Sequence, residues 1–170
     1  MTPSWDLFLT ILFIVGIAYG MMLQRERTVV TLVAVYVALV ITQVLTAPIS
    51  QFFAGEKTIN SFFVSSQVSP FTIQASLFIG LMILVITKGG LNGDRGTGLL
   101  SPFEVFVYSF LNTALIVTTL LSFLPDEARA AMMTQSSMVA FLVNHHTWWL
   151  ALPIASLIFF GWNRHPFVSA

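Results

Sequence analysis

Long apolar stretches separated by short polar ones run through the sequence as far as residue 162. A helix needs about 20 mostly apolar residues to cross a bilayer core of ~30 Å, because lipid offers the backbone no hydrogen-bonding partners. Four stretches meet this requirement. A fifth is shorter and contains Pro153, a residue that transmembrane helices tolerate better than soluble ones. The predicted spans cover residues 5–24, 28–49, 71–87, 103–124 and 147–162.

Two further segments have patterns that suit the membrane surface. In residues 51–66, phenylalanines and an isoleucine recur at helical spacing with polar residues between them, which is typical of an interfacial helix. The alternative is a loop whose phenylalanines pack on the bundle. In residues 126–144, an acidic first turn after a proline favours a helix start, but the apolar part is too short to cross unaided. We expect this helix to be interfacial or re-entrant, on the outer side.

The pattern as a whole predicts an all-α membrane protein. We expect a single transmembrane domain over residues 1–170, built as a bundle of about five transmembrane helices with one or two interfacial helices. The composition agrees, because 56% of the residues are hydrophobic and only 8% are charged, against roughly 25% in a soluble domain.

Charge and cysteine content exclude several functions. Seven Lys and Arg balance seven Asp and Glu, so the chain has no basic excess for binding nucleic acid. The chain contains no cysteine, which excludes disulfides, thiolate nucleophiles, iron–sulfur clusters and cysteine zinc sites. The expected partners are the lipid bilayer and other membrane proteins or further copies of the chain, with no nucleic acid.

The distribution of basic residues predicts the orientation, since short loops rich in Lys and Arg stay in the cytoplasm. The loops expected inside hold Arg25, Arg27, Lys88, Arg95 and Arg164, whereas those expected outside hold only Lys57 and Arg129. This places the N-terminus outside and the C-terminus inside a bacterial plasma (inner) membrane. With four spans instead of five, both termini would lie outside.

Two features of the span ends refine this picture. The first span lacks a positively charged segment before it and a clear cleavage site, so we expect it to be retained. Tryptophans at span ends suit an aromatic belt at headgroup depth, and we interpret Trp5, Trp148, Trp149 and Trp162 as such anchors.

Small residues four apart recur in every predicted span, with Gly16 and Gly20 in the first and Thr72, Ser76 and Gly80 in the third as examples. Such spacing lets helix backbones approach closely in lipid. It is consistent with packing inside one chain, which we favour, and with a face for oligomerisation.

No charged residue lies near the middle of any predicted span, which argues against ion-coupled transport. The candidate intramembrane polar residues are Asn112, near the centre of the fourth span, and Gln43 and Gln74 in the outer halves of the second and third. Because those two spans run in opposite directions, Gln43 and Gln74 are expected at similar depth and could bond each other. We favour this structural role over a pore lining.

The remaining chemistry predicts no catalytic, cofactor or metal site, and we expect the protein not to be an enzyme. His145 and His146 are adjacent, so on a helix they diverge by about 100° and do not readily share one metal. The glycine-rich loop from Lys88 to Pro102 lacks the Lys-Ser/Thr pair of a phosphate-binding loop. No Ser, His and Asp set is placed for hydrolysis.

The order of features over residues 4–122 resembles the colicin V production (CvpA-like) family of bacterial inner-membrane proteins. The resemblance lies in Trp5-Asp6, Gly16, Gly20, the turn Arg25-Glu26-Arg27 and the loop from Gly90 to Gly98. It implies an inner-membrane accessory protein linked to toxin export or envelope homeostasis, without catalytic residues.

These features together predict a non-enzymatic accessory or scaffold protein of the membrane that works through its exposed loops. The candidate partner contacts are Asp94 and Arg95 inside, and Phe52, Phe53, Phe62 and Phe63 outside. The alternative is a small channel or transporter subunit.

Overall fold

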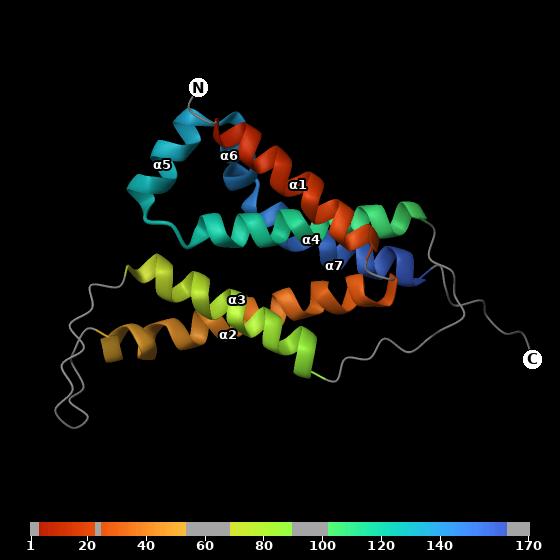
Figure 1. Cartoon of the computed structure of the whole chain (residues 1–170), viewed down its shortest axis with the longest axis horizontal. Coiled ribbons are helices and arrows are strands. Elements are labelled where there is room, and N and C mark those ends of the chain that lie inside the picture. Colours follow the sequence, from red (N-terminus) through yellow and green to blue (C-terminus); the bar gives the residue numbers. More distant parts are fainter. Residues whose placement is uncertain (1–3, 23–24, 54–68, 90–101, 163–170) are drawn as a thin grey trace, which may run out of the picture.

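The computed structural model describes residues 4–22, 25–53, 69–89 and 102–162, and all the regular secondary structure in these residues is helical. The helices are α1 (Trp5–Met22), α2 (Arg25–Phe53), α3 (Pro70–Lys88), α4 (Pro102–Ser122), α5 (Asp126–Gln135), α6 (Ser137–Asn144) and α7 (His146–Trp162). Figure 1 shows them as a bundle of long helices, with α5 and α6 gathered at one end. The expected all-α architecture is confirmed for the described residues.

Four of the helices are long and apolar enough to cross a membrane: α1, α3 and α4 over their whole lengths and α2 over Arg27–Gln51. The apolar part of α7, His146–Phe160, is shorter. The first four expected spans therefore each correspond to a helix of sufficient length, whereas the fifth corresponds to the shorter helix α7.

Helix α2 is longer than its expected span. It continues to Phe53 although Pro48 lies within it, a position that transmembrane helices accept. Residues 51–53, where we expected an interfacial helix to begin, form the last turn of α2. Residues 54–66 of that expected helix lie outside the described residues, and so do Phe62 and Phe63.

The helix expected over residues 126–144 is divided in two, which corrects the sequence interpretation. Ser136 has an extended backbone, with φ −142° and ψ 119°, and separates α5 from α6. Its Oγ accepts a hydrogen bond from the Val139 backbone N at 3.0 Å. Serine stabilises a helix start in this way, which favours a break at this position over a continuous helix.

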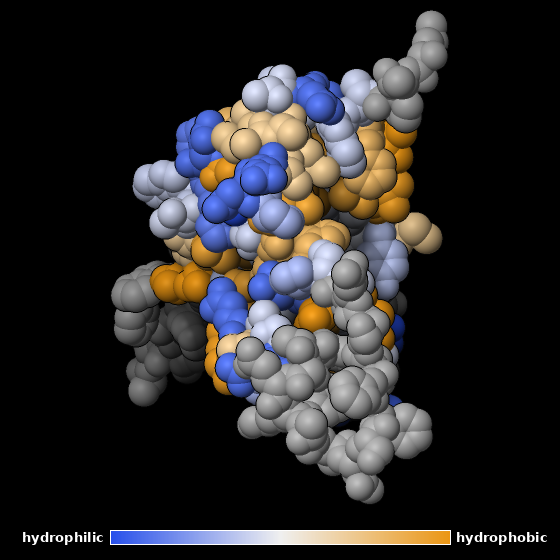
Figure 2. All heavy atoms as spheres, turned by 90° about the vertical axis from the view of Figure 1, so that its left-hand side faces the viewer, coloured by the Kyte–Doolittle hydropathy of each residue, from blue (hydrophilic) through white to orange (hydrophobic). Residues whose placement is uncertain are grey.

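Helix α4 is the centre of the bundle and the most deeply buried of the four long apolar helices. Helix α1 crosses one side of α4. Helices α2 and α7 lie along α4, and α3 packs on α2 at the edge of the bundle (Figure 1). Seen from the end that carries α5, hydrophilic side chains cover much of the surface (Figure 2). The other helices therefore surround α4, and α3 lies at the periphery of the bundle.

Three apolar clusters hold these helices together, and two of them contain most of the buried members. One joins α1, α6 and α7 to α4, with Phe13, Ala114, Leu142 and Trp149 among its buried members. The other joins α2 and α3 to α4. Trp149 is only 8% exposed, so its predicted place in an aromatic belt is wrong, whereas Trp148 is 64% exposed. The bulk of Trp149 fills the core where α4, α6 and α7 meet.

The glycines of α1 permit a close approach to α4. A Cβ added at Gly16 would overlap the Thr113 side chain, and one at Gly20 would overlap the Ser109 side chain. The small residues of α1 therefore serve packing inside the chain, as the sequence favoured. Gly80 of α3, by contrast, has no other atoms near its side-chain position.

Candidate functional site: buried polar groups around helix α4

Helix α4 carries four of the eight buried serine and threonine side chains in the described residues. Ser109, Thr113 and Thr118 each donate a hydrogen bond to a backbone carbonyl one turn earlier in α4, at 2.7–2.8 Å. This pairing satisfies a hydroxyl without a partner from another helix. The hydroxyl groups of these three residues are therefore buried without being left unpaired.

Four other buried polar atoms have no such partner, and one of them, the Trp149 Nε1 in α7, lies outside α2 and α4. The Oγ1 atoms of Thr42 and Thr119 and the Oδ1 atom of Asn112 are buried and make no hydrogen bond within the described residues. Both threonines are 0% exposed. Because buried polar groups in proteins are nearly always paired, these atoms are the strongest candidates for a function beyond packing.

The register of α2 and α4 brings these residues to one seam. The two helices run in the same direction (Figure 1), and Ala38 of α2 lies in one buried cluster with Leu115 of α4. Thr42 and Thr119 each lie one helical turn further along, while Asn112 precedes Leu115 by about one turn. We call this region, defined by Thr42, Asn112 and Thr119, the α2–α4 seam.

Two tyrosines attach α7 to the same helices. The Tyr36 hydroxyl of α2 donates to the Leu150 carbonyl at 2.6 Å, and the Tyr108 hydroxyl of α4 donates to the Ser156 carbonyl at 3.4 Å. Both acceptors lie within one turn of Pro153, which removes a backbone donor from α7. Side chains of neighbouring helices commonly compensate for such a break inside a membrane protein.

A polar contact at the other end of α1 holds α6. The Asp6 carboxylate accepts hydrogen bonds from the Ser136 Oγ at 2.5 Å and from the Met138 backbone N at 3.1 Å. Asp6 thus completes the cap that Ser136 forms on α6, and its negative charge suits the positive end of that helix. The sequence shows Asp6 only as an acid near a span start, with nothing to indicate a partner 130 residues away.

The polar residues named from the sequence are not brought together. Gln43 is exposed on the surface of α2 and Gln74 is half-buried on α3. No hydrogen bond joins their side chains in this part of the structure, so the proposed bond between them is absent. Of the three candidates, only Asn112 belongs to the seam.

The candidate partner contacts lie largely beyond what the structure describes. Asp94 and Arg95 are outside the described residues, as is most of the glycine-rich loop. Phe52 and Phe53 are the last two residues of α2, and their side chains lie outside what the structure describes.

His145 and His146 do not belong to a larger cluster of possible metal ligands in the described residues. His145 is exposed at the end of α6 and its ring lies 4.7 Å from that of Phe141, measured between centroids. In residues 4–22, 25–53, 69–89 and 102–162, no three His, Asp or Glu side chains are grouped so as to hold a metal ion.

Comparison with known proteins adds no family to this picture. The chain matches no protein-family model, and no curated protein or solved structure matches it.

Proposed function

We propose that the chain is a non-enzymatic accessory protein of a bacterial inner membrane, which acts by contact with other membrane proteins or with copies of itself. The placement of charge carries this proposal. In the described long helices, charged residues lie only in the first or last turn, as Asp6, Arg27, Lys88 and Glu104 illustrate. The spans therefore offer no ionisable group for coupling or catalysis at depth.

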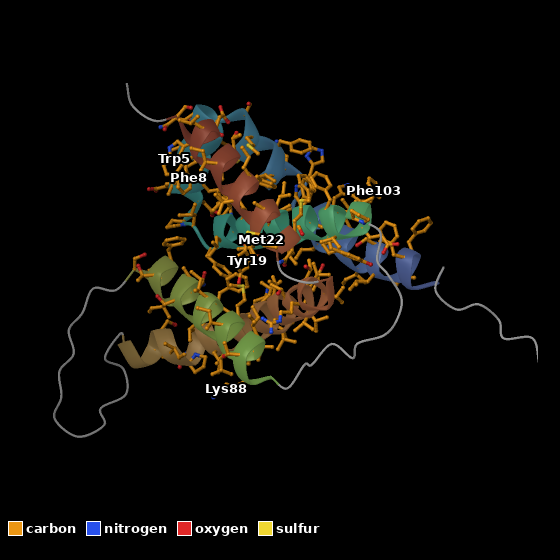
Figure 3. All side chains as sticks on the ribbon, turned by 45° about the vertical axis from the view of Figure 1, so that its right-hand side comes forward. Trp5, Phe8, Tyr19, Met22, Lys88 and Phe103 are labelled. Carbon is orange, nitrogen blue, oxygen red and sulfur yellow. The ribbon has the colours of Figure 1, made fainter. Side chains whose placement is uncertain are left out.

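The outer surface of the bundle supports residence in lipid. Large apolar side chains are exposed along α1, α2, α3 and α7, among them Ile14, Val44, Leu84 and Phe159. Figure 3 shows Trp5 and Phe8 projecting at the start of α1, and Tyr19 and Met22 near its end. Such a surface suits a bilayer and would be an aggregation hazard in water.

We further propose that α7 crosses the membrane as the fifth span. Trp149 near its start packs in one cluster with Leu121 at the end of α4. Phe160 near its end packs against Val105 and Tyr108 at the start of α4. Helix α7 thus returns along the length of α4, which supports an outer N-terminus and an inner C-terminus.

The inner loop containing Asp94 and Arg95 is the proposed contact with a partner protein. The two residues are adjacent and opposite in charge. Opposite charges in a solvated loop contribute only about 0–1 kcal/mol to stability, so we expect their loss to leave folding nearly intact. The resemblance to CvpA-like proteins suggests a partner in toxin export or envelope homeostasis, but the proposal does not depend on it.

The experiment compares the native chain with the Asp94→Asn, Arg95→Gln double variant. Each chain is crosslinked to its neighbours and purified together with them. Quantitative mass spectrometry should show specific membrane proteins, or crosslinked copies of the chain, depleted in the variant at equal expression and equal Tm. A variant that fails to accumulate in the membrane would assign the loop to folding. An unchanged set of neighbours would refute the contact.

The α2–α4 seam favours a second candidate function, a small channel or transporter subunit. Asn112 and the two threonines supply polar atoms inside the bundle that need hydrogen-bonding partners, as the lining of a solute path does. Flux of an ion or small solute into proteoliposomes that is abolished by Asn112→Leu would favour this function. Absence of flux with the native chain would leave the accessory role.

A further inference from the structure

The threonines of the α2–α4 seam differ from other buried threonines in the bundle. Thr118, next to Thr119 in α4, is equally buried and donates to the Ala114 carbonyl at 2.7 Å. Thr119 and Thr42 have the same option within their own helices but do not use it. Their hydroxyls therefore remain available to another group.

The seam offers both hydrogen-bond donors and hydrogen-bond acceptors. A hydroxyl donates one hydrogen bond and accepts others, while the Asn112 Oδ1 only accepts. In the described residues, none of these three atoms has a protein partner. A ligand that satisfies them must be small, because Thr42 and Thr119 are 0% exposed, and it must both donate and accept.

Water meets these requirements, since a buried water typically makes two to four hydrogen bonds to polar groups that would otherwise be unpaired. We propose that the α2–α4 seam is a binding site for internal waters: one water bridges the hydroxyls of Thr42 and Thr119, and another donates to Asn112, which lies about two turns before Thr119 in α4. The bridge links α2 to α4 through polar contacts in addition to their apolar packing. The inference holds for an accessory protein and for a channel subunit alike.

The test is water-edited solid-state NMR on the full chain in liposomes, with isotopically labelled threonine. Magnetisation transferred from water should reach Thr42 and Thr119 several-fold faster than it reaches Thr118. Thr118 is the matched control because it has the same chemistry, the same burial and a backbone partner. Equally slow transfer to all three threonines would overturn the proposal.

Variants separate a bridge from two independent waters. Thr42→Val keeps the shape of the side chain and removes its hydroxyl, so the transfer to Thr119 should slow several-fold, whereas Thr42→Ser should preserve it. Thr118→Val should leave the Thr119 signal unchanged. If Thr42→Val has no effect on Thr119, the bridge is refuted. If Thr42→Val fails to fold, Thr42→Ala replaces it as the variant without a hydroxyl: a slowed Thr119 signal supports the bridge and an unchanged one refutes it.

Discussion

Among the described glycines, Gly20 of α1 leaves the least room for a side chain, because an added methyl group would overlap the Ser109 side chain. We predict that Gly20→Ala lowers the stability of the bundle by about 1–3 kcal/mol, the usual cost of overpacking. The loss can be measured as a lower Tm in detergent by fluorescence-detected thermal unfolding.

Gly80→Ala is the matched control, because nothing occupies the space beside Gly80. It is expected to leave the Tm unchanged or to raise it slightly, since alanine favours helix more than glycine does. Equal losses from the two substitutions would show that α1 and α4 are not in close contact. The sequence has the same small-residue spacing in both helices, so only the structure distinguishes the packed glycine from the open one.

At the scale of the element, α6 depends on a cap that two distant segments share. Ser136 accepts from Val139 and donates to Asp6, and loss of such a capping side chain costs about 1 kcal/mol. We predict that Ser136→Ala lowers the Tm and that Ser136→Asn largely restores it. Adding Asp6→Ala to Ser136→Ala should lower the Tm by less than the sum of the separate effects. Fully additive effects would contradict a shared cap.

Helix α7 depends on a hydroxyl from α2. Tyr36→Phe removes the donor to the Leu150 carbonyl and leaves the ring in place. We predict a loss of about 1 kcal/mol, the net value of a typical hydrogen bond. Thermal unfolding measures it, with Tyr19→Phe as control because Tyr19 is 62% exposed. If the two variants unfold alike, the Tyr36 bond does not contribute to the attachment of α7.

The apolar stretches predicted the described long helices well, because helix formation in lipid depends on length and local composition. They did not predict the break at Ser136, whose cap includes Asp6 from the other end of the chain. They also misplaced Trp149, because a tryptophan at a span end suits a lipid interface and a protein core equally well. Contacts between distant residues decide both cases.

The candidate site was less predictable than the fold. The sequence marks Asn112 as a polar residue at depth, but it does not distinguish Thr42 or Thr119 from the other threonines of the spans. Whether a threonine bonds its own backbone depends on its rotamer and its neighbours, which spacing along the chain does not reveal. Likewise, the bond expected between Gln43 and Gln74 required a helix rotation that the sequence does not specify.

For the molecule as a whole, the central claim is a membrane bundle in which α7 crosses as the fifth span. The chain contains no cysteine, so single cysteines at Ser4 and Ser169 can report the two sides without background. They are labelled with a membrane-impermeant thiol reagent in intact cells and again after permeabilisation. We predict that the Ser4 position reacts in intact cells and that the Ser169 position reacts only after permeabilisation. Equal labelling of both positions from outside would contradict the fifth span and leave a bundle of four.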